Sequence, residues 1–162
     1  MKLLRRFPSI KGFTIIELLV VIAILGVLIT FGINLWQRAV VNARDATREQ
    51  DLNQVKTALE LYFDENGSYT PSNSGDIGCE DVPGGRTISW GIEFECFGIR
   101  YMKRLPRDPI AITSHHYCYV ASGATPDSFE LWADMENDNN SNTSDSPPAA
   151  CMGYDYVIVN SN

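Results

Sequence analysis

The chain has 162 residues, which is enough for one small domain with an appendage. Its formal net charge is −7, with 13 Lys and Arg against 20 Asp and Glu. Four of the basic residues lie in the first eleven positions, so the remainder holds 9 (13 − 4) basic and 20 acidic residues. An acidic body repels phosphate, which argues against nucleic acid as an expected partner.

Residues 1–12 form a short basic stretch, MKLLRRFPSIKG, which Pro8 interrupts. Such a stretch is typical of a processing segment, and we exclude it from the fold. A basic tip beside an apolar run also indicates a segment held on the cytoplasmic side of a membrane.

Residues 13–36 are predominantly apolar with one charge, Glu17, and can span a bilayer, which needs about 20 apolar residues. A secretory signal peptide is the alternative. Its apolar core has about 7–15 residues and is followed by a small-x-small cleavage site. This run is longer, and no Ala-x-Ala site follows it. We therefore predict a membrane-spanning half of a helix.

Residues 37–66 are predicted to continue the helix as an amphipathic half. No Pro or Gly occurs from Gln37 to Glu65, and Asn66-Gly67 supplies a stop signal. Charged residues, Arg48 among them, are expected mostly off the apolar face, so one side of the helix needs a globular domain. The apolar stripe recurs at the helical period and consists of Leu52, Val55, Leu59 and Tyr62.

Residues 67–162 are predicted to form the globular part. Residues 68–91 are rich in Gly, Ser, Asp and Pro and are typical of a loop. Three later runs are strand-like: residues 116–121 (HYCYVA), 129–133 (FELWA) and 154–159 (YDYVIV). They predict an α+β protein in which a long N-terminal helix packs on a small antiparallel β-sheet.

Residues 11–28, KGFTIIELLVVIAILGVL, resemble the class III signal sequence of type IV pilins and type II secretion pseudopilins. The strong match covers residues 11–31. The resemblance implies a pilin fold, cleavage between Gly12 and Phe13 by a prepilin peptidase, and N-methylation of Phe13. Glu17 matches the glutamate that family members carry at the fifth residue of the mature chain.

Glu17 is expected to direct assembly. An acidic side chain at the centre of a membrane segment costs about 2.5–3.5 kcal/mol on insertion scales and is usually functional. Cleavage exposes a free amino group at Phe13, and the amino group of a neighbouring subunit would supply the countercharge. That pairing would set the axial register of a staggered bundle. The alternative is that Glu17 reaches the lipid headgroups and does nothing specific.

A second resemblance lies in residues 101–109, YMKRLPRDP, which are similar to the Leu-Pro-Lys-Asp-Pro loop of major pseudopilins. Residues 57–72 are also similar to the corresponding segment of that family. Both features favour the major-pseudopilin branch. The alternative interpretation of LPRDP is an ordinary turn fixed by proline.

An acidic segment near the C-terminus is a candidate calcium site. Oxygen ligands at alternate positions suit calcium, and the resemblance to major pseudopilins implies calcium in a C-terminal loop at this place. The segment is not an EF-hand, because Asn139 stands where that loop has Gly. A solvated acidic loop is the alternative. The candidate ligands are Asp134, Glu136, Asp138, Asn140 and Asp145.

Four cysteines follow the apolar segment, and none lies in a C-x-x-C pair. An even number beyond a membrane favours disulfides in an oxidising compartment, with buried free thiols as the alternative. Four cysteines allow three connectivities. We expect the pairs Cys79–Cys96 and Cys118–Cys151, each within its own region.

These features predict a structural filament subunit. The resemblance implies polymerisation with itself and with related minor pilins or pseudopilins, through a prepilin peptidase and a membrane assembly platform. It also implies a single-pass inner-membrane protein with its globular domain outside, and later an extracytoplasmic filament. An enzyme is not expected, because no phosphate loop, nucleophile elbow or acid/base pair occurs.

The sequence leaves a type IV pilus and a type II secretion pseudopilus open. It also leaves two rivals, neither of which needs Gly12, Phe13 and Glu17 in this arrangement. One is a membrane-anchored, non-polymerising binding module or adhesin. The other is a secreted enzyme with an uncut anchor.

Overall fold

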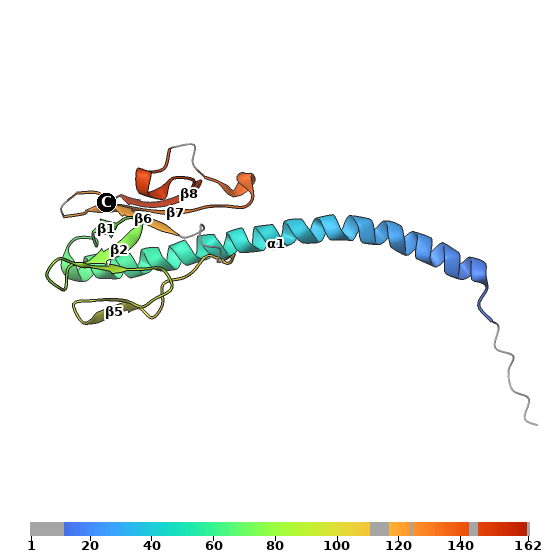
Figure 1. Ribbon diagram of the computed structural model, residues 1–162, viewed down its shortest axis with the longest axis horizontal. Helices are drawn as coiled ribbons and strands as arrows, with labels where there is room; N and C mark the ends of the chain where they lie inside the picture. The colour runs from blue at the N-terminus through green and yellow to red at the C-terminus, as the bar shows by residue number, and fades with distance from the viewer. Residues whose placement is uncertain (1–11, 111–116, 124, 143–145, 162) are drawn as a thin grey trace, which may run out of the picture. The chain divides into compact units, whose positions relative to one another are not determined.

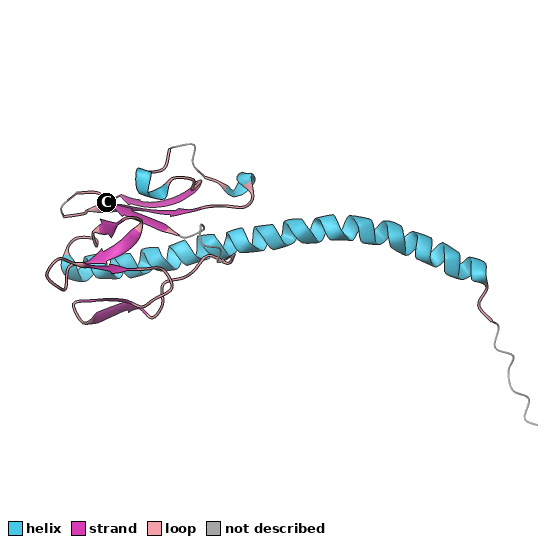
Figure 2. Cartoon of the chain, viewed as in Figure 1, coloured by secondary structure: helices cyan, strands magenta, loops and turns pink. Residues whose placement is uncertain are grey.

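The computed structural model describes residues 12–110, 117–123, 125–142 and 146–161. The chain divides into two compact units, Met1–Ala39 and Val40–Asn162, which are described separately below. The elements appear in Figures 1 and 2. In chain order they are α1 (Ile15–Asn66), β1 (Ser72–Asn73), β2 (Asp76–Cys79), β3 (Arg86–Ile88), β4 (Phe94–Cys96), β5 (Ile99–Met102), β6 (Cys118–Ala121), β7 (Ser128–Ala133), the 3-10 helices η1 (Asp138–Asn140) and η2 (Ala149–Cys151), and β8 (Tyr156–Ser161).

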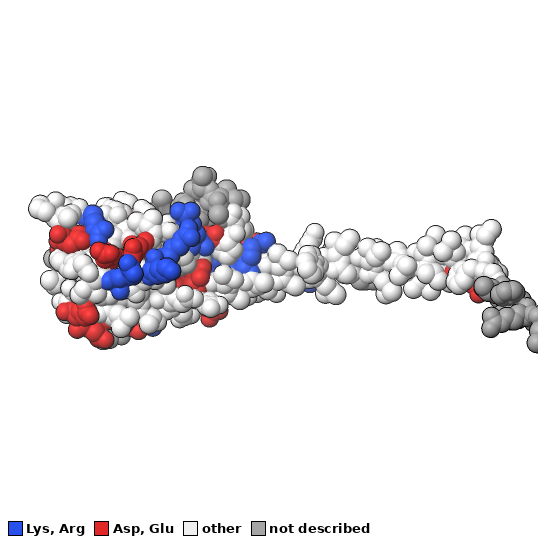
Figure 3. All heavy atoms as spheres, turned by 90° about the horizontal axis from the view of Figure 1, so that it is seen from below, with Lys and Arg blue, Asp and Glu red and all other residues white. Residues whose placement is uncertain are grey.

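The first unit contains an apolar stretch of α1 with no described side chain buried. Ile15 is 84% exposed and Leu35 69% exposed. Figure 3 shows this stretch almost entirely white, the colour of residues other than Lys, Arg, Asp and Glu. By length and composition α1 can cross a membrane. An apolar surface of this size in water indicates a helix that needs lipid or other helices around it.

Helix α1 ends where the sequence predicts. Gly67 adopts a φ of 73° and donates its backbone N–H to the carbonyl of Phe63 at 2.7 Å. This left-handed residue satisfies a carbonyl that the helix end would leave free, and glycine adopts it without a Cβ clash. The side chain of Asn66 donates to the carbonyl of Tyr62 at 2.8 Å and so closes the last turn.

In the second unit, the predicted apolar stripe of α1 is buried in the core, which confirms the expected face of the helix. Leu52, Val55 and Leu59 are fully buried and Tyr62 is 5% exposed. Tyr62 contacts Phe94 of β4 and Tyr101 of β5, with ring centroids 6.1 and 5.1 Å apart. The hairpin β4–β5 therefore packs directly on the end of the helix.

Truncation of the stripe should be costly. We expect Leu59→Ala to lower the free energy of unfolding by about 2–5 kcal/mol, because it removes a fully buried side chain and leaves a cavity. The matched control is Leu61→Ala on the same helix, where the side chain is 52% exposed and a change within about 0.5 kcal/mol is expected. Urea unfolding of the full chain in detergent measures both. Equal effects at the two positions would contradict this packing.

The predicted antiparallel sheet is present as β6–β7–β8, with β7 in the centre. Leu131 of β7 pairs with Tyr119 of β6 and with Ile158 of β8. Along β7 the side chains alternate, so that Phe129 and Leu131 join the main core whereas Trp132 packs in a second cluster. Residue 116, at the start of the first predicted run, lies outside the described residues.

The expectation of a loop over residues 68–91 was wrong, because this segment contains a second antiparallel sheet, β1–β2–β3. Its strands have two to four residues, which is too short for an alternating pattern to be recognised in the sequence. The buried side chains of Ile77 and Ile88 pair across β2 and β3 and hold the sheet against the core. The turns between the strands supply the Gly- and Ser-rich composition that is typical of a loop.

Both disulfides have the pairs expected from the sequence. Cys79–Cys96 joins β2 to β4, and Cys118–Cys151 joins β6 to η2, with Cα atoms 5.9 and 5.7 Å apart. All four cysteines are buried. Neither bond involves α1, so the helix is held in the second unit by noncovalent contacts and by the chain continuing at Gly67.

Candidate functional site

The residues next to the expected cleavage position lie ahead of the helix. Gly12 and Phe13 precede Ile15, the first residue of α1, and Phe13 is 77% exposed. Among the described residues, no atom would lie within 4 Å of a Cβ at Gly12. The peptide bond between Gly12 and Phe13 is therefore outside regular structure, and no described atom crowds the Gly12 side of it.

Glu17 closes a capping box at the start of α1. Its Oε2 accepts hydrogen bonds from the backbone N–H of Thr14 at 2.9 Å and from the Thr14 hydroxyl at 2.8 Å. In return the backbone N–H of Glu17 donates to Thr14 Oγ1 at 3.3 Å. These bonds satisfy helix N–H groups that would otherwise lack a partner. The Thr-x-x-Glu spacing is the sequence signal of a capping box, and it was not among the predictions above.

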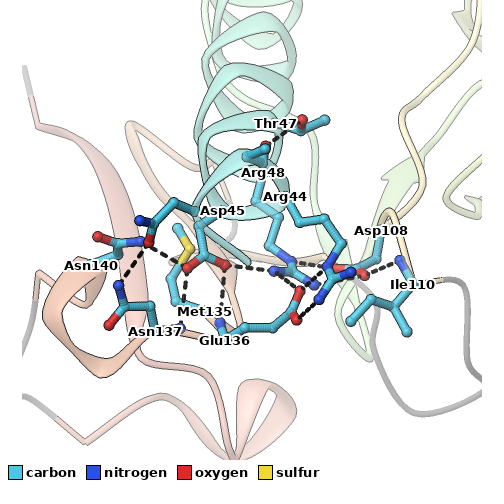
Figure 4. A network of polar contacts seen from close by, with 12 residues as sticks. Arg44, Asp45, Thr47, Arg48, Asp108, Ile110, Met135, Glu136, Asn137 and Asn140 are labelled. Atoms are coloured by element: carbon cyan, nitrogen blue, oxygen red, sulfur yellow. Dashed lines mark hydrogen bonds and ion pairs between the residues drawn. The ribbon is translucent and has the colours of Figure 1, made fainter. Parts of the chain in front are cut away.

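A buried arginine is the centre of a polar network in the second unit (Figure 4). Arg48 is fully buried on the core side of α1, seven residues before Val55, although it was expected off the apolar face. Its Nε and Nη2 donate to the two oxygens of Asp108 at 2.6 and 3.1 Å. Its Nη1 donates to Asp45 Oδ1 at 2.6 Å and to Glu136 Oε1 at 2.9 Å. Three carboxylates thus surround one guanidinium group.

Asp45 holds the segment that follows β7 against α1 through hydrogen bonds. Its Oδ1 accepts the backbone N–H of Glu136 at 3.0 Å, and its Oδ2 accepts the backbone N–H of Asn137 at 3.1 Å. The side-chain amide of Asn140 donates to Oδ2 at 2.8 Å. Asp45 therefore bridges Arg48 and the loop 134–140, as Figure 4 shows.

The structure gives the LPRDP segment a specific role. Leu105 is fully buried in the core, and Asp108 is 6% exposed in its bidentate pair with Arg48. Asp108 also accepts the backbone N–H of Ile110 at 2.9 Å. The segment is therefore anchored in the core by Leu105 and joined to α1 by the ion pair of Asp108, neither of which an isolated proline turn would need.

The candidate calcium ligands do not form one site in the described residues. Glu136 accepts from Arg44 Nε at 2.7 Å, from Arg44 Nη2 and from Arg48, so both its oxygens face cations. Asn140 donates to Asp45, Asp138 is exposed in η1, and Asp134 is half-buried. Asp145 lies outside the described residues. Glu136 and Asn140 therefore do not suit a shared calcium ion in this arrangement, and calcium binding by the whole segment stays a prediction.

Among the described residues, one other cluster combines acidic and thiol groups: Asp81 lies close to the sulfurs of Cys79 and Cys96. These sulfurs are bonded to each other, and Asp81 pairs with Arg86. A metal would need free thiolates, so this grouping does not bind one while the disulfide is formed.

The network makes stability depend on pH. Hydrogen bonding from Arg44 is the main cause that lowers the pKa of Glu136. Burial raises the pKa of Asp45, but the donors from Glu136, Asn140 and Asn137 outweigh it, and the net shift is downward. A carboxyl group with a lowered folded pKa stabilises the fold above its unfolded pKa of about 4, and this is lost as pH falls.

We therefore expect the melting temperature to fall as the pH is lowered from about 5 to about 2, and to fall less in Glu136→Gln, which has no charge to lose. Asp51, whose pKa burial raises, acts in the opposite direction. Asp51 is present in both chains, so the difference between their melting temperatures at each pH reports the contribution of Glu136. Parallel pH profiles for the two chains would contradict the expectation. Thermal unfolding followed by circular dichroism measures it.

Comparisons with known proteins add to this geometry. Residues 8–33 match the family model described as "Prokaryotic N-terminal methylation motif". The chain is 28% identical over 139 residues to type II secretion system core protein G of Pseudomonas aeruginosa, covering 83% of this chain and 92% of the relative. It is 30% identical over 136 residues to the Vibrio cholerae protein of the same name, covering 81% and 86%. No solved structure matches the chain.

Proposed function

Because the chain belongs to the family of type II secretion system core protein G, we propose that it is a structural subunit of a type II secretion pseudopilus that polymerises through α1. The observation that carries this proposal is the helix surface of the first unit. It is apolar and unburied, and it follows an open Gly12–Phe13 bond. Such a helix is stable in lipid or in a bundle of its own kind.

The proposed sequence of events begins in the inner membrane. A prepilin peptidase cuts between Gly12 and Phe13 and Phe13 is N-methylated, in keeping with the matched methylation motif. The apolar helices then leave lipid and pack against one another on a membrane assembly platform, together with minor pseudopilins. In this bundle Glu17 pairs with the Phe13 amino group of a neighbouring subunit, which neutralises both charges away from water.

Filament growth also needs the globular unit to stay attached to its helix. The buried stripe of α1 and the Arg48 network supply this attachment on the side that faces the sheets. The subunit therefore contributes a shape and an interface, and we assign it no catalytic group. The assembled pseudopilus would extend outward and support protein secretion.

The processing step gives the direct test. Expressed with its secretion machinery, the chain should have a mass equal to residues 13–162 plus one methyl group. Gly12→Val should block cleavage, because a bulky residue would precede the scissile bond. Gly32→Ala is the matched control, since at both glycines no atom lies within 4 Å of an added Cβ. Mass spectrometry of the purified protein reads both results.

Retention of residues 1–12 together with a strictly monomeric state would contradict the proposal. It would favour the rival of a membrane-anchored binding module or adhesin. A type IV pilus would instead be indicated by processed chains that form long surface filaments in cells without secretion components. Electron microscopy of sheared filaments separates these outcomes.

A further inference from the structure

The loop that the sequence marks as a calcium site is built around a cation that belongs to the chain. We propose that the guanidinium group of Arg48 orders the loop 134–140 in place of a divalent metal, so that the loop keeps its structure without calcium. The proposal concerns the fold of the second unit and does not depend on filament formation.

Arg48 occupies the centre of a group of carboxylates, as a bound metal ion would. It is fully buried, and it makes four hydrogen bonds to three carboxylates from separate parts of the chain. Asp45 comes from α1, Asp108 from the LPRDP segment and Glu136 from the loop itself. The planar fork of arginine matches a bidentate carboxylate better than an ammonium group does. One internal charge thus joins the three segments.

The polarity of the loop backbone agrees with this arrangement. The N–H groups of Glu136 and Asn137 point inward onto the Asp45 carboxylate. A calcium loop places carbonyl and carboxylate oxygens inward, around the metal. Here the loop wraps an anion that is itself paired with Arg48. A calcium ion at this point would face N–H groups and a guanidinium, both of which repel it.

The carboxylate of Glu136 is also already bound by two arginines. Both its oxygens accept from Arg44, and one of them also accepts from Arg48. To bind a metal, Glu136 would have to leave two cations, one of which is fully buried. Removing one partner from a buried ionic group is strongly unfavourable. The existing pairs therefore oppose calcium binding by Glu136.

The first experiment uses the unmodified full chain in detergent, with EGTA or with millimolar calcium. We expect the same melting temperature within about 1 °C and the same amide hydrogen exchange over residues 134–142 in both conditions. A ligand that binds only the folded state raises the melting temperature. A rise of about 3 °C or more with calcium, or slower exchange in the loop, would overturn the proposal.

The second experiment removes the internal cation with Arg48→Ala. Exchange over residues 134–142 should become at least about tenfold faster, and methylguanidinium should slow it again by filling the vacated position. Thr47→Ala is the matched control, because Thr47 is exposed and its hydroxyl donates to the Ala43 carbonyl of the same helix. Unchanged exchange in Arg48→Ala, or a loss that methylguanidinium does not reduce, would overturn the proposal. If Arg48→Ala does not fold, Arg48→Lys replaces it, with intermediate exchange expected.

Discussion

Replacement of Glu17 by leucine is expected to abolish filament assembly while leaving membrane insertion intact. If Glu17 meets the Phe13 amino group of a neighbour, its removal leaves a buried ammonium group without a countercharge. An unpaired charge in a membrane-like environment costs about 2.5–3.5 kcal/mol or more, which corresponds to roughly a 100-fold loss in an assembly equilibrium. Filaments sheared from cells and counted by electron microscopy give the measurement.

Glu17 also caps its own helix, so a second variant is needed to separate the two roles. Glutamine at this position keeps an oxygen that can accept from Thr14, as in the glutamine form of the capping box, but it carries no charge. We expect Glu17→Gln to fail in assembly like Glu17→Leu. Normal filaments from Glu17→Gln would show that Glu17 acts through capping alone, and the ion-pair hypothesis would have to be abandoned.

Asp108→Ala is expected to destabilise the second unit strongly. Asp108 is 6% exposed and accepts two hydrogen bonds from the fully buried Arg48. Breaking a buried pair by removing one partner typically costs about 3–5 kcal/mol, because the other charge stays buried. Urea unfolding of the full chain, with both disulfides intact, measures the loss. Asp138→Ala, at an exposed position in η1, is the control and should change stability by no more than about 0.5 kcal/mol.

A double substitution tests the cause of that loss. Arg48→Met with Asp108→Asn removes the buried charge and its main partner together, while Glu136 keeps Arg44 and Asp45 keeps its loop donors. Replacing both partners of a buried pair by groups that need no countercharge is often close to neutral. The double variant should therefore be clearly more stable than Asp108→Ala. If it is equally unstable, packing and not charge determines the importance of this site.

The elements that the sequence predicts correctly are those with long or strongly periodic patterns. The apolar stripe from Leu52 to Tyr62 repeats over several helical turns, so the sequence alone predicts which face of α1 packs against the core. The runs that become β6, β7 and β8 are visible because aromatic and β-branched residues are concentrated there. Strands β1 to β5 have four residues or fewer, and their pairing depends on partners that local composition does not reveal.

The polar network around Arg48 could not be predicted from the sequence, for a different reason. Asp108 lies 60 residues after Arg48, and Glu136 lies 88 residues after it, so no local spacing connects them. A charged residue in an amphipathic helix is ordinarily solvated, which is why Arg48 was expected off the apolar face. It nevertheless lies four residues before Leu52, at the period of the buried stripe, and the partners that allow its burial are distant in the sequence. The Thr14–Glu17 capping box is local, by contrast, and its Thr-x-x-Glu spacing is sufficient to predict it from the sequence.

The placement of the two disulfides has a mechanical consequence. Both lie among the strands and 3-10 helices, so tension applied to α1 from the direction of Val40 meets no covalent crosslink between the helix and the sheets. Among the described residues, the first contacts to bear that load are those of Asn42 and Arg44 with the loop 134–140. The ionic contacts of Asp45 and Arg48 come next, and the apolar contacts from Leu52 onward follow. Because such contacts act over short distances, we expect the helix to separate from the sheets at a threshold force while both disulfides stay intact.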